Sequence, residues 1–179
     1  MKKFITTGVA FFLILFLSSA YGGWDPREKE EEELAVKDTI SLLLSIDPSL
    51  QIYFDKSYAY AVLPTVGKGA FIGGIGYGRG LFFENGKAIG KVSITQLSAG
   101  AQIGGQTYRE IIFFRDKDTA EAFKYGRFEL GTQLSAIAVT DGVGKAGTYT
   151  DGVAVFILPK AGLMAEASVG GQRFDFDPF

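Results

Sequence analysis

The side chains best suited to chemistry in this sequence are basic and aromatic ones that lie close together in the chain. From Gly67 to Lys91 there are four basic residues against one acidic residue, Glu84, which gives a local net charge of +3. The basic residues are Lys68, Arg79, Lys87 and Lys91, and the aromatic residues among them are Phe71, Tyr77, Phe82 and Phe83. Cationic groups beside apolar bodies suit an anionic lipid surface, where each basic residue contributes about 1 kcal/mol. An ordinary half-buried hairpin with solvated lysines is the alternative interpretation.

Alternating glycines precede this cluster and form a second candidate site. On an extended strand Gly74, Gly76, Gly78 and Gly80 would all lie on one face. Strand glycines usually mark a close approach by backbone, by a helix or by an aromatic ring such as Phe82. The functional alternative is a groove that admits an acyl chain or a headgroup.

Most enzyme chemistry is excluded by composition, because the sequence contains no cysteine and no histidine. Thiol nucleophiles, Cys/His zinc sites and imidazole-dependent triads are therefore impossible. The segment from Gly142 to Gly147 has G-x-G-x-x-G spacing, but a turn is expected after it, so no helix N-terminus would face a pyrophosphate. We expect no enzyme activity, no cofactor and no nucleic-acid partner. The pair Asp175 and Asp177 is expected in a solvated tail, with a weak oxygen-only calcium site as the alternative.

The composition indicates one globular core. The chain has 179 residues, of which 47% are hydrophobic and 21% are charged, a balance that one domain of this length can bury. Glycine accounts for 24 of the 179 residues, nearly twice the usual ~7%. The backbone therefore needs positive φ angles or close approaches at many positions.

The first 20 residues resemble a secretory signal peptide. Lys2 and Lys3 precede an apolar run from Val9 to Leu17, and small residues follow it at Ser18-Ser19-Ala20. The run is shorter than the ~20 residues that a membrane-spanning helix needs. We expect export to the periplasm or medium and cleavage near Tyr21; an uncleaved anchor is the alternative.

Residues 21–57 are expected to form an acidic helical segment, with four basic and nine acidic side chains. A helix is predicted from Pro26 to about Ile46, because Asp25-Pro26 is a typical start and acidic residues favour the first turns. Its apolar stripe consists of Val36, Ile40, Leu43 and Ile46. A short second helix is predicted from Ser49 to Lys56.

Residues 58–179 are expected to form a glycine-rich body of strands, in one domain with 26–57. Asn85-Gly86 predicts a tight hairpin turn, and Asp118 with Glu121 has capping-box spacing for a helix from Asp116 to Tyr125. The predicted strands are 58–63, stopped by Pro64, then 70–83, 92–104, 108–114, 134–140, 153–158 and 163–169. The expected fold is α+β, a strongly bent antiparallel sheet or partial β-barrel with about three helices packed on it.

Two short segments repeat faintly. Leu63-Pro64-x-x-Gly67 is echoed by Leu158-Pro159-x-x-Gly162, and Gly104-Gly-Gln106 is echoed by Gly170-Gly-Gln172. Similar bulges or bends in two strands would explain the echoes, and an ancient duplication is the alternative.

Several longer blocks resemble the SYLF domain, a lipid-binding family, in the family's order and spacing. These blocks are 58–64, 66–71, 93–96, 104–114, 128–131 and 162–172. The resemblance implies a compact α+β domain that binds phospholipids and has no established catalytic activity. Eukaryotic members bind phosphoinositides, and some bind actin.

One departure limits what the resemblance implies. Eukaryotic members use a basic N-terminal helix at the membrane, whereas the corresponding helix here begins with Glu28 and the run Glu30 to Glu33, which anionic lipid would repel. Actin and phosphoinositide binding are therefore not expected. The sequence predicts a non-enzymatic phospholipid-binding module of the bacterial cell envelope, peripheral at a membrane. A structural or protein-interaction module without a specific lipid is the alternative.

Overall fold

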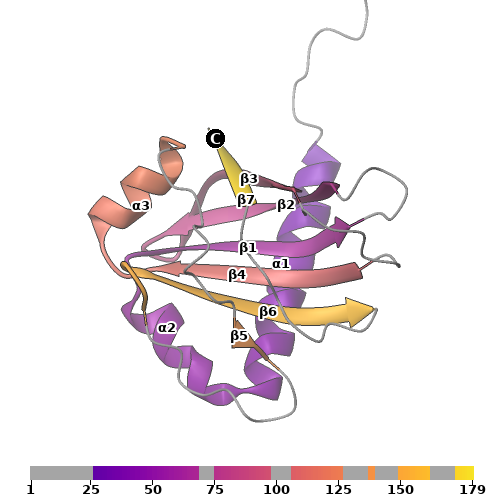
Figure 1. Ribbon diagram of the computed structural model, residues 1–179, viewed down its shortest axis with the longest axis horizontal. Helices are drawn as coiled ribbons and strands as arrows, with labels where there is room; N and C mark the ends of the chain where they lie inside the picture. The colour runs from indigo at the N-terminus through magenta and orange to yellow at the C-terminus, as the bar shows by residue number, and fades with distance from the viewer. Residues whose placement is uncertain (1–25, 69–74, 98–105, 127–136, 140–148, 162–171) are drawn as a thin grey trace, which may run out of the picture. The chain divides into compact units, whose positions relative to one another are not determined.

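A computed structural model describes six stretches of the chain: residues 26–68, 75–97, 106–126, 137–139, 149–161 and 172–179 (Figure 1). The chain divides into two compact units, Met1–Glu31 and Glu32–Phe179. The sheet and the side chains packed against it belong to the second unit. The predicted signal segment, residues 1–20, lies outside the described residues. Within the described stretches, no helix is long and apolar enough to cross a membrane.

The N-terminal helices form where the sequence predicts them. Helix α1 covers Pro26–Ile46, a 3₁₀ turn η1 covers Pro48–Leu50, and helix α2 covers Gln51–Lys56. Asp47 caps the 3₁₀ turn, since its carboxylate accepts a hydrogen bond from the Ser49 N–H at 3.0 Å. Val36 and Leu43 of the predicted apolar stripe are buried, and Ile40 and Ile46 are partly buried against the same core.

Helix α3 covers Lys117–Lys124, and its capping residue lies two residues before the predicted one. Asp116 is the capping residue, and its carboxylate accepts hydrogen bonds from the N–H of Thr119 at 3.0 Å and from its hydroxyl at 2.7 Å. The predicted box of Asp118 and Glu121 is therefore wrong. The helix itself is confirmed.

Within the described residues, seven strands form one sheet, in the order β5-β6-β4-β1-β2-β3-β7 (Figure 1). Their bounds are β1 Ala59–Lys68, β2 Ile75–Glu84, β3 Lys87–Leu97, β4 Gln106–Phe114, β5 Ile137–Ala138, β6 Val153–Ala161 and β7 Gln172–Pro178. All neighbours pair antiparallel except the short β5 with β6. The described sheet is open, with β5 and β7 at its edges. An α+β fold with an antiparallel sheet is thereby confirmed.

The turn between β2 and β3 has the predicted geometry. Asn85 and Gly86 have φ angles of +50° and +76°, as a type I′ turn requires. A second turn of this kind lies at Asp151 (φ +50°) and Gly152 (φ +82°), where Thr150 and Val153 exchange two backbone hydrogen bonds.

The predicted end of the first strand and the predicted C-terminal tail are both wrong. Pro64 does not stop β1, because the pairing of β1 with both neighbours shifts register around it, and a bulge tolerates the missing N–H. Asp175 and Asp177 are not in a free tail, since β7 pairs with β3 along its length. The strand predicted at 163–169 lies outside the described residues.

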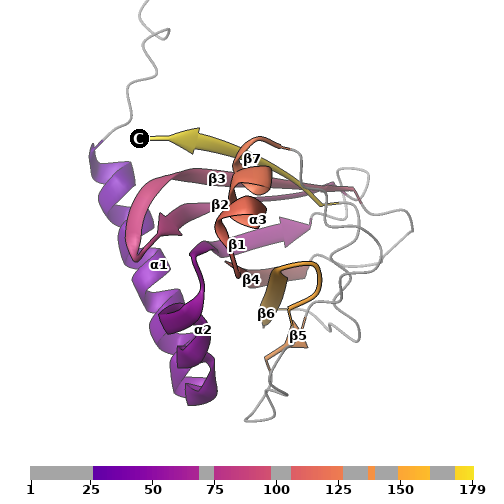
Figure 2. The same cartoon turned by 90° about the vertical axis from the view of Figure 1, so that its left-hand side faces the viewer.

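The sheet buries side chains on both faces, and Figure 2 shows its strands from a second side. On the face that we call the α1 face, Val62, Leu81 and Ile111 cluster with residues of α1 and α2. The α2 ring of Tyr53 lies 5.3 Å from that of Phe113 and 5.0 Å from that of Phe156. The two N-terminal helices thus contact one face of the sheet.

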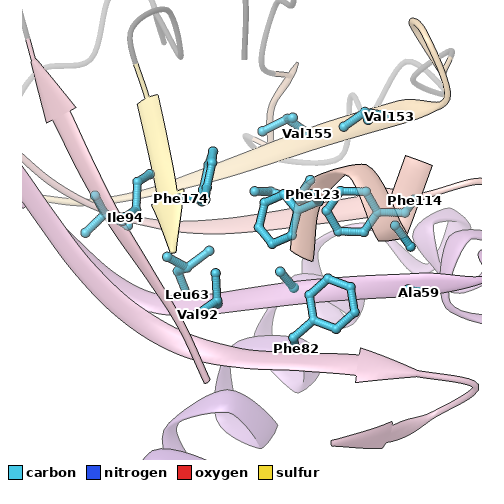
Figure 3. Packing of buried hydrophobic residues seen from close by; sticks show 14 of the residues in the cluster. Ala59, Leu63, Phe82, Val92, Ile94, Phe114, Phe123, Val153, Val155 and Phe174 are labelled. Carbon is cyan, nitrogen blue, oxygen red and sulfur yellow. The ribbon is translucent and has the colours of Figure 1, made fainter. Parts of the chain in front are cut away.

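The opposite face, which we call the α3 face, holds a second cluster (Figure 3). Phe123 of α3 lies at its centre, with ring centroids 4.7 Å from Phe114, 5.6 Å from Phe82 and 5.0 Å from Phe174. Strand residues that the sequence separates by nearly a hundred positions therefore meet around one helical aromatic ring.

Candidate functional site

The predicted basic residues are divided between the two faces of the sheet. Arg79 and Tyr77 alternate with the glycines of β2 and are on the α1 face with Leu81; both are exposed, Tyr77 to 55%. Lys91 is opposite Leu81 in the register and so shares that face. Lys87 is opposite Glu84, which contacts α3, and is therefore on the α3 face.

The remaining predicted lipid-binding positions are at or beyond the described strand ends. Lys68 is the last residue of β1 and pairs with Gly76 of β2. Phe71 and Gly74 are outside the described residues. The structure thus brings together Tyr77, Arg79 and Lys91, from adjacent strands, as one part of the predicted site.

The glycine face of β2 is occupied by protein. A Cβ atom on Gly80 would lie 1.9 Å from the backbone oxygen of Val62, and one on Gly78 would lie 2.8 Å from the backbone oxygen of Thr65. Side chains of Val66 and Ile94 come within 2.9 Å of the same position on Gly78. Close approach by neighbouring backbone, the structural interpretation, accounts for these two glycines, and no room for an acyl chain is left over them.

A buried polar network, which sequence reasoning missed, crosses the α3 face. Its members are 0–2% exposed, and they are Gln96, Tyr108, Glu110 and Gln172. The Tyr108 hydroxyl donates to Gln96 Oε1 at 2.8 Å, and Gln172 Nε2 donates to Glu110 Oε2 at 3.0 Å. Burial, and next the nearby charge of Glu110, raise the pKa of Tyr108. The one available signal was the Gly-Gly-Gln echo that ends at Gln172.

A second polar group anchors α3 to the end of the sheet. The hydroxyl of Tyr58 donates to Glu84, and Lys124 Nζ lies 3.1 Å from Glu84 Oε2 and 2.8 Å from Glu121 Oε1. The hydrogen bond from Tyr58, followed by that from Lys124, holds the pKa of Glu84 below its usual value. This arrangement ties helix α3 to the end of strand β2.

Three basic residues from other strands share the α1 face with Arg79, and none of them was among the predicted binding residues. They are Arg109 of β4, Lys160 of β6 and Arg173 of β7. Arg109 alternates with the buried residues of β4, the Lys160 ammonium reaches Thr65 on this face, and Arg173 pairs with Thr95, which alternates with Ile94. Their separation in the sequence hides them, because only the sheet order aligns them with β2.

Candidate metal ligands are sparse. Asp175 and Asp177 share the exposed side of β7, but among the described residues no three Asp or Glu side chains gather where they could hold a metal ion. Among the described acidic groups, Asp47 and Asp116 act as caps, and Glu84 and Glu121 contact Lys124 of α3.

Fold and site together define a small α+β domain with basic side chains on one exposed sheet face. Residues 95–178 match the family model described as "Ysc84: Las17-binding protein actin regulator", which is the SYLF domain. Over 160 residues the sequence is 27% identical to Beta cell expansion factor A of Aeromonas veronii, covering 86% of this chain and 60% of that relative. The resemblance to the SYLF family is thereby confirmed, and residues 95–178 carry that family's domain.

Proposed function

We propose that this protein is a non-enzymatic phospholipid-binding module of the bacterial cell envelope. The observation that carries the proposal is the exposed pair Tyr77 and Arg79 on the α1 face of a SYLF-type domain. An aromatic ring with a polar tip and a neighbouring guanidinium suit the interface between headgroups and acyl chains. The absence of cysteine and histidine supports a role without catalysis.

Export and a peripheral membrane position belong to the same proposal. The N-terminal basic, apolar and small-residue pattern of residues 1–20 supports export. N-terminal sequencing of protein recovered from an expressing bacterium should begin within a few residues of Tyr21. Recovery of protein that starts at Met1 from the cytosol would contradict export.

A strongly bent sheet, close to a partial barrel, is also part of the proposal. In sheet order β4 and β7 are four steps apart, which in a flat sheet corresponds to about 19 Å at about 4.8 Å a step. Gln172 of β7 nevertheless reaches Glu110 of β4 at 3.0 Å. Curvature toward the α3 face explains that contact and leaves the α1 face convex.

Co-sedimentation with vesicles tests the lipid contact. The double variant Tyr77→Ala/Arg79→Gln should bind vesicles of phosphatidylglycerol in phosphatidylcholine about tenfold more weakly than wild type, because one charge and one interfacial ring are lost. The matched control is Lys117→Gln, which removes one exposed charge at the start of α3. All three proteins carry the same N-terminal segment, so its contribution cancels.

The alternative, a structural or protein-interaction module, makes the opposite forecast. It predicts that the wild-type protein does not sediment with these vesicles. If the double variant and the control bind vesicles equally well, the protein binds lipid but Tyr77 and Arg79 do not contact it.

A further inference from the structure

Two proline bulges shape one end of the α1 face. In β1 the register shifts around Pro64, and in β6 it shifts so that Lys160 is the extra residue between Pro159 and Ala161. Each bulge lies at a Leu-Pro pair, the echo seen in the sequence. Bulges commonly re-aim side chains beside functional sites, and here they flank β4 from both sides.

The residues after the two prolines meet across β4. Lys160 Nζ donates to Thr65 Oγ1 at 2.6 Å, although the strands that carry them are not neighbours. Arg109 is on the intervening strand, and Thr65 pairs with Arg79 on the other side. The strand order β6-β4-β1-β2 therefore places four side chains in one row across the sheet: Lys160, Arg109, Thr65 and Arg79.

This row carries a net positive charge, with three basic side chains against one acidic side chain, Asp175. Among the described residues, no carboxylate forms an ion pair with Arg79, Arg109 or Lys160. Arg79 and Lys160 are exposed, and Arg109 is partly exposed. Burial and then the positive charge of Arg109 lower the pKa of Lys160. Asp175 is farther along the row, at the β7 edge beyond β3.

We propose that Arg79, Arg109 and Lys160 form a binding site for the anionic phosphate of a phospholipid headgroup. The two arginines come from strands two steps apart, about 10 Å, so both guanidinium groups can reach one phosphate and bind it through paired hydrogen bonds. Lys160 supplies a third positive charge, and Thr65 positions it. This inference rests on the proposed function, because the site would supply the contacts to the phosphate of the bound lipid.

The test compares charge-matched double variants by titration with vesicles of phosphatidic acid in phosphatidylcholine. Arg109→Gln/Lys160→Gln should weaken binding about thirtyfold, as expected for two basic residues at about 1 kcal/mol each. The control Lys56→Gln/Lys117→Gln removes two exposed charges elsewhere and should bind as wild type does. Lys160→Arg should retain most of the affinity, and circular dichroism should show that each variant is folded.

Inorganic phosphate at constant ionic strength distinguishes the source of the phosphate. Displacement of wild type from vesicles by free phosphate would show that the site takes the phosphate group alone; no displacement, with the variant still impaired, would show that the bilayer presents it. Equal binding by the two double variants would overturn the site and leave the proposed function standing. If wild type binds inorganic phosphate but no vesicle, and the site variant loses that binding, the proposed function fails and the phosphate site remains. If wild type binds neither, both fail.

Discussion

At the scale of single residues, the same residue type has opposite roles at different positions of the strands. Gly80 is required because the backbone of β1 occupies the place of its side chain, whereas nothing lies within 4 Å of a Cβ atom on Gly67. The alternation of glycines predicted a close approach, which the structure describes at Gly78 and Gly80. It could not reveal what approaches, because the bulge at Pro64 depends on pairing with two other strands.

Gly80→Ala should therefore be strongly destabilising. Overpacking against a backbone carbonyl at 1.9 Å forces strands apart, with an expected cost of about 3 kcal/mol or more. Gly67→Ala, on the neighbouring strand, should change the free energy of unfolding by less than about 0.5 kcal/mol. Urea unfolding of both variants measures the difference, and equal midpoints would show that the close approach is not rigid.

Glu84 should make stability depend on acid pH. Its pKa in the folded protein is lowered from 4.5 by Tyr58 and then Lys124, so its stabilisation is present above pH 4.5 and is lost as pH falls through the folded value. Glu84→Gln should thus be less stable than wild type at pH 7, and the difference should shrink as the pH falls below 4.5. Thermal unfolding over this pH range tests this; a constant difference would refute the ionic anchor.

At the scale of elements, local signals were sufficient wherever neighbouring residues decide the structure. The bounds of α1, the turn at Asn85-Gly86 and the start at Asp47 were predictable from caps, periodicity and turn chemistry. Strand β7 was missed because its identity depends on pairing with β3, and its two exposed aspartates have the composition of a tail. The row of Arg79, Arg109 and Lys160 was missed for the same reason, since only sheet order assembles it.

Helix α1 offers a matched pair for testing its packing role. Leu43 is 2% exposed against the sheet and its neighbour Leu42 is 37% exposed. Leu43→Ala should cost about 2–5 kcal/mol because it leaves a cavity in the core. Leu42→Ala should cost less than about 1 kcal/mol. Calorimetry of the two variants distinguishes them, and a similar loss in both would place the packed stripe elsewhere on the helix.

At the scale of the whole molecule, the two faces of the sheet have different tasks. The α3 face encloses an aromatic core and a buried polar network, which supports the proposed bend. The α1 face is apolar under the helices and basic beyond them. The fold class and family could be predicted from glycine content, periodicity and motif blocks. The placement of Lys87 and Arg79 on opposite faces could not be predicted, because a register shift leaves Ile89 of β3 as an extra residue and moves Lys87 to the other face.

The most direct measurement of the central claim is the affinity of wild-type protein for vesicles as a function of lipid charge and salt. The account predicts stronger binding to phosphatidylglycerol vesicles than to pure phosphatidylcholine vesicles at 0.1 M salt. It also predicts that this preference disappears at 1 M salt, where the Debye length falls from about 10 Å to about 3 Å. Equal affinity for both vesicle types at 0.1 M salt, or no binding to either, would contradict a cationic phospholipid-binding surface.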